Sequence, residues 1–359
     1  MINLFSIRPR GFNIGNDVIY VGLNHFIRQT FKENFNIISF PATSKYESHK
    51  KSGLSSQTIY DINQFGHGVI IGGGNLYENG ELEIDPIALR ALEKPMMLFS
   101  LARGKIYNRR LELVDRTDVM TDDKIILLNK KATVSLSRDI ATHEYINTLG
   151  ENNILGGCPT LFINEIPQHI VPLLNSDKTD ALISVRNPAL MSIPVSFQYK
   201  IREDIINLIS LLNKQGYKNI KILCHDHRDI PFADSLNVDY LYTEDVYTFL
   251  SYLRNTRLNL TYRLHSFIPC LAFDVPTINI SYDQRSISLI ETLKISEWNV
   301  NMMTNDVIAE VKNRLDNLPQ LTEIKKELRK NVWPALKESM LSGCTKFANG
   351  VKSQVYGKY

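Results

Sequence analysis

Residues 258–272 read LNLTYRLHSFIPCLA, and this stretch decides the fold class. Residues 258–262 form a short apolar run that ends at Arg263, and apolar residues at helical spacing follow over 264–272. A second short apolar run, 276–280, comes a few residues later. A buried strand, a helix and another buried strand in this order form a βαβ unit, and such units build parallel sheets.

The same alternation of short apolar runs and amphipathic stretches fills most of the chain. It predicts strands at 3–7, 35–40, 69–71, 96–100 and 133–137 in the first half, and at 181–185, 220–224, 258–262 and 276–280 in the second. It predicts helices at 17–31, capped by Asp17, and at 124–130, 201–212, 244–253 and 264–272, with a helical tail over 321–351. We therefore expect an α/β protein with mostly parallel sheets.

The length of 359 residues suits two domains better than one core. The alternation restarts after a stretch at 165–178, which predicts an N-terminal domain over 1–170 and a C-terminal domain over 171–359. Both have the pattern of a Rossmann-like, doubly wound domain, and we expect them to face each other across a cleft. The last helix, which carries Trp333, could pack back on the first domain or form an interface, and we expect the former.

The composition argues against several classes of protein. The formal charge is only +3, from 41 basic and 38 acidic residues, which gives no support for a nucleic-acid partner. The four cysteines form no CxxC pair, so a reducing compartment is indicated rather than a disulfide framework. Apolar runs fall short of the roughly 20 residues of a membrane helix. We expect a cytoplasmic protein, with peripheral association at a membrane left open.

Ligands of doubly wound sheets bind beyond the carboxyl ends of the strands. The residues that follow each predicted strand are therefore the candidate site, and they come from both predicted domains. They are Gly72-Gly73-Gly74-Asn75, Arg138-Asp139, Arg186-Asn187, His225-Asp226-His227, Arg263-Leu264-His265-Ser266 and Tyr282-Asp283.

Arginine and histidine in this set indicate an anion site with acid–base chemistry. Arginine binds carboxylate and phosphate oxygens through its planar fork. Arg138, Arg186 and Arg263 in one cleft would hold a small, multiply charged anion. His265, at the start of a predicted helix, can transfer a proton near neutral pH.

Other candidates have two interpretations each. Gly73 and Gly74 would let backbone N–H groups reach the ligand, or would only make a tight turn. Ser266 either caps its helix or binds the ligand. Tyr282 and Asp283 belong either to a turn or to the cleft, where the carboxylate could orient a sugar hydroxyl.

His225 and His227 stand two positions apart at a predicted strand end. Alternate residues of a strand point to opposite faces, so the pair could share a metal only if the strand has already ended. We favour a polar lining role for His225 and expect no metal.

Taken together, these segments resemble the polysaccharide pyruvyl transferase family. Their order and rough spacing match from about residue 10 to 290, and the Arg-Leu-His-Ser segment with Tyr-Asp some way downstream is the most diagnostic part. The family's first turn usually has Asp directly after Gly, whereas Asn16 intervenes here. The matching pieces are Asn13-Ile14-Gly15-Asn16-Asp17, Val69-Ile70-Ile71-Gly72-Gly73-Gly74-Asn75, Ser135-Leu136-Ser137-Arg138-Asp139, Ile183-Ser184-Val185-Arg186, Tyr262-Arg263-Leu264-His265-Ser266 and Pro276-Thr277-Ile278-Asn279-Ile280-Ser281-Tyr282-Asp283.

The resemblance implies a fold similar to the two-domain GT-B glycosyltransferases, with the acceptor on the N-terminal domain and the donor on the C-terminal one. It implies transfer of a pyruvyl group from phosphoenolpyruvate to a sugar of a cell-surface polysaccharide or its lipid-linked precursor, as a ketal. Arg263 and Arg186 would then hold the donor and His265 would transfer the proton, with Asn75 near donor or sugar. No metal or nucleotide cofactor is implied. The polar segments 42–58 and 77–85 are candidates for acceptor choice.

Two other functions stay open at this point. A GT-B glycosyltransferase with a nucleotide-sugar donor would need a carboxylate for the ribose, for which Glu244 or Asp245 could serve, although Asp at a helix start is more often a cap. A sugar- or anion-binding module without catalysis would keep the arginines and have no need for His265.

Overall fold

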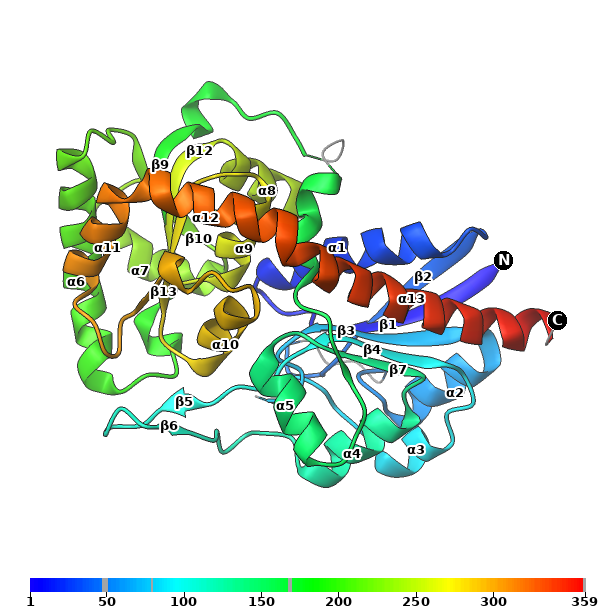
Figure 1. The fold of residues 1–359 in the computed structure, drawn as a ribbon. Coiled ribbons are helices and arrows are strands. Elements are labelled where there is room, and N and C mark those ends of the chain that lie inside the picture. The colour runs from blue at the N-terminus through cyan, green and yellow to red at the C-terminus, as the bar shows by residue number, and fades with distance from the viewer. Residues whose placement is uncertain (47–50, 79, 167–169, 358–359) are drawn as a thin grey trace.

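The computed structural model describes residues 1–46, 51–78, 80–166 and 170–357. Within these residues the chain forms two α/β lobes, each built on a six-stranded parallel sheet, and a small two-stranded hairpin. Figure 1 shows the lobes side by side, with both chain termini at the outer end of the N-terminal lobe. The predicted class, two facing doubly wound domains, is confirmed.

The N-terminal sheet has the order β2-β1-β3-β4-β7-β8. Its central strands are buried along their whole length, as expected for a parallel sheet covered on both faces. The order reverses between β1 and β3, which makes their carboxyl ends the switch point of this sheet. The strands are β1 Ile2–Arg8, β2 Phe35–Pro41, β3 Gly68–Gly74, β4 Met96–Leu101, β7 Val134–Ser137 and β8 Ile154–Leu155.

The C-terminal sheet has the order β11-β10-β9-β12-β13-β14, and its switch point lies between β9 and β12. Parallel pairing of Ile183 with both Ile222 and Leu260 puts β9 in the middle. The strands are β9 Thr179–Val185, β10 Ile220–Cys224, β11 Tyr240–Leu241, β12 Thr256–Thr261, β13 Thr277–Ser281 and β14 Asn299–Asn301.

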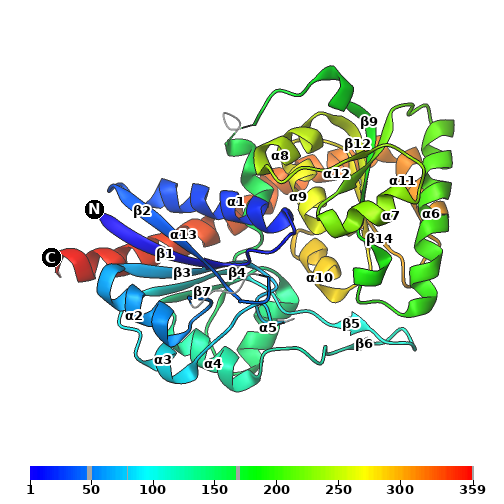
Figure 2. The ribbon, with the colours of Figure 1, turned by 180° about the vertical axis from the view of Figure 1, so that it is seen from behind.

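Helices cover both faces of each sheet (Figure 2). Those of the first half are α1 Gly15–Thr30, α2 Ser56–Phe65, α3 Pro86–Arg90, α4 Asp122–Lys131 and α5 Ile140–Thr148, with the 3₁₀ helix η1 Pro159–Glu165. Those of the second half are α6 Val195–Lys214, α7 Ile230–Asp234, α8 Val246–Arg254, α9 Leu264–Ala272, α10 Gln284–Thr292, α11 Val307–Asp316, α12 Leu318–Asn331 and α13 Trp333–Tyr356, with short 3₁₀ helices at η3 Asn175–Asp177, η4 Pro188–Leu190, η5 His227–Asp229 and η6 Ser296–Trp298. None of the described helices is long and apolar enough to cross a membrane.

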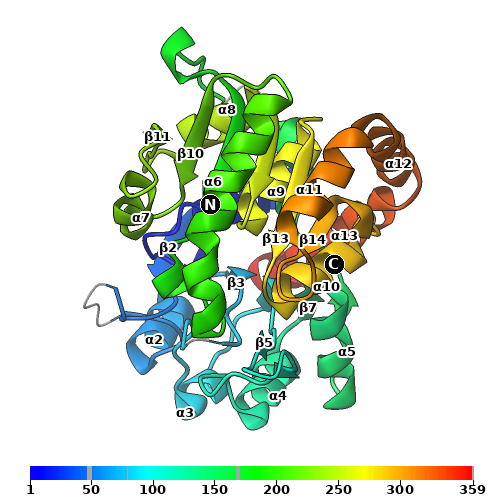
Figure 3. The ribbon, with the colours of Figure 1, turned by 90° about the vertical axis from the view of Figure 1, so that its left-hand side faces the viewer.

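An apolar core joins the lobes behind the cleft. Val18 of α1 and Ile14, which directly precedes this helix, share one cluster with Phe249 and Leu250 of α8. A second cluster joins Ile19 to residues of α9 and to Trp333. Figure 3 shows the C-terminal lobe standing above the N-terminal lobe, with α9 and α10 directed toward it. The carboxyl ends of the two sheets are thereby fixed opposite each other.

Two excursions cross between the lobes. The last helix, α13, returns to the N-terminal lobe, where Met340 and Phe347 pack in the same cluster as Leu4 and Phe26. The hairpin of β5 Ile106–Tyr107 and β6 Leu113–Val114 leaves the N-terminal lobe and reaches the other one. There the amide of Asn301 donates to the hydroxyl of Tyr107 at 2.9 Å.

The structure corrects several of the predictions made from the sequence. Helix α1 starts at Gly15, so Asp17 lies inside its first turn and pairs with Arg8 at 2.6 Å instead of capping the helix. The polar segment 42–58 is partly buried in its described residues, since Ala42 and Leu54 are fully buried, and α2 begins within it at Ser56. Residues 47–50 of that segment, 79 of the second polar segment and 167–169 of the expected linker lie outside the described residues.

Candidate active site

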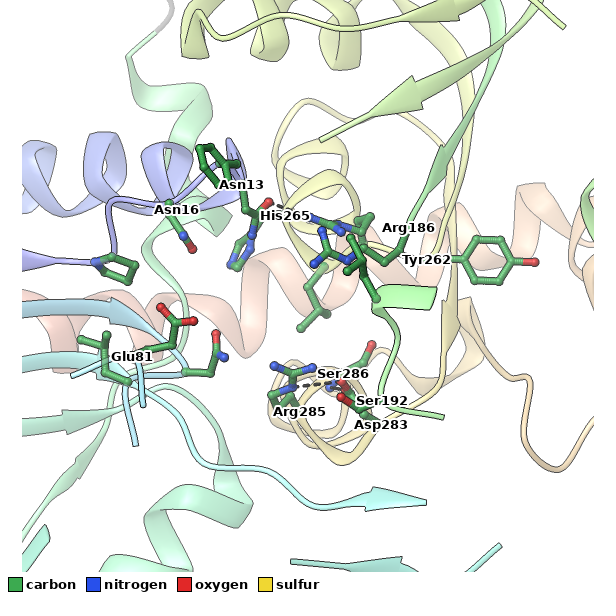
Figure 4. A pocket seen from close by; sticks show the side chains of 18 of the residues that line it. Asn13, Asn16, Glu81, Arg186, Ser192, Tyr262, His265, Asp283, Arg285 and Ser286 are labelled. Atoms are coloured by element: carbon green, nitrogen blue, oxygen red, sulfur yellow. Dashed lines mark hydrogen bonds and ion pairs between the residues drawn. The ribbon is translucent and has the colours of Figure 1, made fainter. Parts of the chain in front are cut away.

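A cavity of about 240 Å³ lies between the carboxyl ends of the two sheets (Figure 4). The two switch points face each other there, because the loops after β1 and β3 form one wall and the residues after β9 and β12 form the other. The lining residues are Pro9, Gly11, Phe12, Asn13, Asn16, Tyr46, Asn75, Leu76, Glu81, Arg116, Arg138, Arg186, Leu190, Ser192, Arg228, Tyr262, Arg263, Leu264, His265, Tyr282, Asp283, Arg285 and Ser286.

Positive charge dominates this cavity. Six of the arginines that the structure describes line it, against the two carboxylates of Glu81 and Asp283. An arginine-rich, partly desolvated pocket favours ligands with carboxylate or phosphate groups. The six are Arg116, Arg138, Arg186, Arg228, Arg263 and Arg285.

Arg186 and Arg263 stand side by side because they follow the two central strands of the C-terminal sheet. Arg186 lies 3.2 Å from Asp226 and 3.7 Å from Asp229, and Arg263 lies 3.8 Å from Asp229. Arg263 also donates to the amide oxygen of Asn13 at 2.7 Å. Asp226 and Asp229 thus hold three arginines in place: Arg186, Arg228 and Arg263. Three positive and two negative charges leave this cluster with a net positive charge.

Arg138 enters the cavity from the N-terminal lobe, after β7. It is 2% exposed, and its nearest carboxylate, Asp139, is 3.5 Å away. Neither Nε nor Nη2 of Arg138 has a hydrogen-bond partner among the described residues. A buried guanidinium with unmade hydrogen bonds is costly in free energy, so Arg138 is a candidate group for binding a ligand.

His265 lies in the first turn of α9, in the middle of these charges (Figure 4). Burial, and then Arg138, Arg263 and Arg285, lower the pKa of His265 to about 3. The imidazole is therefore neutral at physiological pH in this environment. Its Nε2 finds no hydrogen-bond partner in the described part of the chain.

Gly15 allows this histidine to sit where it does. A Cβ added at Gly15 would lie 2.9 Å from Cβ and 3.1 Å from Nδ1 of His265. The turn after β1 therefore packs directly on the histidine, and a side chain at this position would displace one of them.

Glu78 is a buried carboxylate behind the cavity that the sequence reading missed. Its side chain is fully buried, 3.5 Å from Arg116 and 3.8 Å from Arg285. Burial raises the pKa of Glu78 to about 7, with Asp283 adding to the rise and Arg285 opposing it. Both carboxylate oxygens lack a hydrogen-bond partner in the part of the chain that the structure describes.

Seven predicted residues come together in the lining: Asn75, Arg138, Arg186, Arg263, His265, Tyr282 and Asp283. Both oxygens of the Asp283 carboxylate already have hydrogen-bond partners within the protein. One oxygen accepts from the backbone N–H of Ser286 at 3.0 Å as the cap of α10, and the other binds the guanidinium of Arg285. Asp283 is thus better placed to orient Arg285 than to orient a sugar hydroxyl.

Four predicted binding residues lie outside the lining. Gly73 and Gly74 turn the chain with φ of 78° and 92°, and a Cβ on Gly73 would come within 2.2 Å of Ile19, so this turn serves helix packing. Ser266 is buried and bonds the hydroxyl of Ser184 at 2.7 Å, neither capping α9 nor reaching the cavity.

His225 is the fourth of these residues. It points into the core, where its ring lies 4.7 Å from that of Phe249, while the side chain of His227 is 47% exposed. The two rings diverge. No group of three or more metal-binding side chains occurs among residues 1–46, 51–78, 80–166 and 170–357.

Several residues that line the cavity were not predicted from the sequence. Arg285 follows Asp283 by two positions and could have been found by extending the strand-end rule into the next helix. Arg116 comes from the crossing hairpin, where it donates to Ser192 of the other lobe at 2.9 Å. No local signal in the sequence places a hairpin residue of one lobe in this cavity.

Fold and cavity together define a GT-B-like protein with an arginine-rich cleft between two Rossmann-like lobes. The model of the polysaccharide pyruvyl transferase family matches residues 13–284, and the chain belongs to that family. No protein of curated function matches this chain.

Solved structures share the fold at low sequence identity. S. aureus MnaA, in a structure with UDP, has 12% identity and a TM-score of 0.57 over 100% of this chain and 98% of that chain. A putative UDP-N-acetylglucosamine 2-epimerase from Listeria monocytogenes has 11% identity and a TM-score of 0.57 over 100% and 97%. The corresponding epimerase from Rickettsia bellii has 12% identity and a TM-score of 0.57 over 99% and 97%. These similarities establish the two-lobed architecture.

Proposed function

We propose that the protein transfers the pyruvyl group of phosphoenolpyruvate onto two hydroxyls of a sugar and forms a pyruvate ketal. The sugar belongs to a cell-surface polysaccharide or its lipid-linked precursor. Family membership supports pyruvyl transfer in polysaccharide synthesis. The observation that supports phosphoenolpyruvate as the donor is the arginine-lined cavity. Arg138 and His265 both line it, and two guanidinium nitrogens of Arg138 have no hydrogen-bond partner among the described residues.

Phosphoenolpyruvate matches the charge of this cavity. It carries a carboxylate and a phosphate on adjacent groups, and arginines converge from both lobes. Arg186 and Arg263 bind one anionic group from the C-terminal side, and Arg138 binds the other from the N-terminal side. Hydrogen bonds between charged partners of this kind contribute about 1.5–3 kcal/mol each.

The reaction balances without a redox partner. A proton adds to the methylene carbon of the donor, and the first sugar oxygen bonds to the adjacent carbon. The bond from that carbon to the phosphate oxygen then breaks, and the second sugar oxygen takes its place. One hydroxyl proton is accounted for by the new methyl group and the other by the released phosphate. The scheme requires no metal and no nucleotide.

His265 transfers the proton to the methylene carbon. Burial is the largest cause of the lowered pKa of His265, and the three arginines add to it; the anionic groups of the donor offset the arginines, so the imidazole gains proton affinity as the donor binds. Donor binding and protonation of His265 are therefore coupled. Arginines around the leaving phosphate supply the electrostatic stabilisation, where one lost group costs on the order of 3 kcal/mol.

The alternative is a glycosyltransferase with a nucleotide-sugar donor. The names of two similar structures include UDP or UDP-N-acetylglucosamine, which motivates this alternative. Its ribose carboxylate would be Glu244 or Asp245. Asp245 instead caps α8 by accepting from the N–H of Thr248 at 2.7 Å, and neither residue lines the arginine cavity. We therefore favour the pyruvyl donor.

A lipid-linked acceptor would place the protein at the cytoplasmic face of a membrane, as a peripheral protein. The direct test incubates it with phosphoenolpyruvate and a panel of free and lipid-linked sugars, and follows phosphate release. Acceptor-dependent release supports the proposal. Absence of release with every acceptor, together with tight binding of a nucleotide sugar, would refute it.

A further inference from the structure

An aromatic cluster stands at the edge of the cavity. The ring of Phe12 is 46% exposed and lies edge-on to Tyr46, with centroids 5.6 Å apart, and to His227, at 4.5 Å. The guanidinium of Arg228 lies 5.2 Å from the centre of the Phe12 ring. Phe12, Tyr46 and Arg228 line the cavity. An exposed ring of this kind is ordinary alone, but here it borders a charged cleft between two lobes.

Tyr46 connects this cluster to a carboxylate. Its hydroxyl donates to Glu81 at 2.8 Å, and Glu81 is 8% exposed while it lines the cavity. Burial raises the pKa of Tyr46 to about 12, and Glu81 adds to the rise, so the hydroxyl stays protonated. Figure 4 shows Glu81 on the N-terminal wall, across the cavity from Arg186 and Arg285.

Glu81 is the lining carboxylate that accepts a hydrogen bond from Tyr46 and that Figure 4 shows opposite Arg186 and Arg285. Asp283, the other carboxylate in the described lining, is committed to the cap of α10 and to Arg285. A ketal-forming reaction needs a group that accepts the proton of an attacking hydroxyl. The position of Glu81 opposite the donor arginines fits that role.

We infer that Phe12, Tyr46 and Glu81 form the subsite for the acceptor sugar, with Glu81 as the base for its attacking hydroxyl. A pyranose has an apolar face of C–H groups and an edge of hydroxyls. The Phe12 ring contacts the face, and Glu81 with the amides of Asn13 and Asn16 contacts the edge. This inference rests on the proposed function, since it assigns the second substrate of that reaction.

The chemistry of the step is a proton transfer coupled to bond formation. The first hydroxyl oxygen bonds to the carbon that carries the phosphate ester, and its proton passes to the Glu81 carboxylate. That proton leaves with the phosphate when the bond from carbon to phosphate oxygen breaks, so the carboxylate is regenerated. The proton of the second hydroxyl replaces the one that His265 gave to the methyl group. Tyr46 holds the carboxylate toward the sugar through its hydrogen bond and acts as a positioning residue.

The two polar segments expected to choose the acceptor meet at this place. Tyr46 comes from the segment 42–58 and Glu81 from the segment 77–85, and Gly11 lets the Tyr46 ring approach, since a Cβ there would lie 3.2 Å from it. His227 and Arg228 come from the C-terminal lobe. The subsite therefore spans both lobes, beside the donor arginines.

The first test compares Phe12→Ala with Phe65→Ala. Phe65 is 60% exposed on α2, away from the cavity, and serves as a matched control. Saturation-transfer NMR with methyl α- and β-pyranosides of glucose, galactose, mannose and their 2-acetamido forms reports sugar binding without any turnover. We expect Phe12→Ala to weaken the best-bound pyranoside about tenfold, and Phe65→Ala to leave it unchanged. Failure of every pyranoside to show Phe12-dependent binding would overturn the inference.

The second test compares Glu81→Gln with Glu151→Gln. The side chain of Glu151 is 10% exposed in the same lobe, outside the cavity, where it pairs with Lys130. With Glu81→Gln we expect kcat for transfer to fall at least about 100-fold, while the donor KM stays within about twofold of wild type. Tyr46→Phe should show a smaller fall in kcat, and Glu151→Gln none. A Glu81→Gln enzyme with wild-type kcat overturns the assignment of the base.

The outcomes separate this inference from the proposed function. If phosphoenolpyruvate is not a donor, Phe12-dependent pyranoside binding still supports the sugar subsite. If pyruvyl transfer occurs and Phe12→Ala lowers only the melting temperature, with acceptor KM and pyranoside binding unchanged, the aromatic cluster merely holds the lobes together and the inference is wrong.

Discussion

The guanidinium of Arg263 donates a hydrogen bond of 2.7 Å to the side-chain oxygen of Asn13, across the boundary between the two lobes. The same oxygen accepts from the backbone N–H of Gly15 at 3.2 Å. The turn after β1 and the strand end after β12 are thereby locked together at the cavity. The backbone N–H of Ile14 reinforces this contact by donating to the carbonyl of His225 at 3.0 Å.

Replacing Asn13 by Ala should weaken donor binding. Arg263 would lose the partner that orients its fork, at a cost of about 1–2 kcal/mol, which corresponds to a donor KM roughly ten times higher. Steady-state kinetics with phosphoenolpyruvate as the varied substrate measure this effect. A lower melting temperature with unchanged donor KM would contradict it and limit Asn13 to joining the lobes.

Gly15→Ala should damage catalysis with little loss of fold. The added methyl group would lie 2.9 Å from Cβ of His265, so the imidazole must move. We expect kcat to fall at least about tenfold, because small displacements of a reacting group are costly. Gly350→Ala is the matched control, since its Cβ would meet only ordinary contacts at 3.5 Å within α13. That variant should keep full activity.

Glu78 should make the stability of the protein fall as pH rises. Its pKa is about 7 in the fold against 4.5 as a free side chain, so the folded state binds more protons than the unfolded state between these values. The contribution of Glu78 to the free energy of unfolding is fully present below about pH 4.5. It is lost as pH rises through 7, by up to roughly 3 kcal/mol. Glu78→Gln should therefore be more stable than wild type at about pH 8 and close to it at about pH 5. Urea unfolding at both pH values is the measurement, and equal differences at both would contradict this account.

Donor binding should draw protons from solution. Burial and three arginines keep His265 neutral, and an anionic ligand that offsets the arginines raises its pKa back toward the ordinary value. Calorimetric titration with phosphoenolpyruvate near pH 6.5, in two buffers with different ionisation enthalpies, gives the number of protons taken up. His265→Gln should remove most of the uptake. The comparison is best made in a Glu78→Gln background, because Glu78 titrates near the same pH; equal uptake with and without His265 would refute the coupling.

Local patterns were enough to predict the layers of the fold and part of the cavity. The apolar runs marked the central strands, and α9 was predicted at residues 264–272, where it lies. Arg138, Arg186 and Arg263 reach the cavity because the strand-end rule applies to any parallel sheet. The placement of other residues depends on packing between distant segments. Gly73 leaves room for the side chain of Ile19, and the hydroxyl of Ser266 bonds that of Ser184. Arg116 follows a hairpin that contacts the other lobe, and no local pattern in the sequence predicts that contact.

The most direct measurement follows the carbon that the reaction moves. Phosphoenolpyruvate labelled with ¹³C at its second carbon is incubated with the protein and a sugar acceptor, and the products are analysed by NMR. The account predicts a labelled quaternary ketal carbon on the sugar, formed in step with phosphate release and lost in His265→Ala. Label that stays in phosphoenolpyruvate or appears only in free pyruvate, with every acceptor tried, would contradict it.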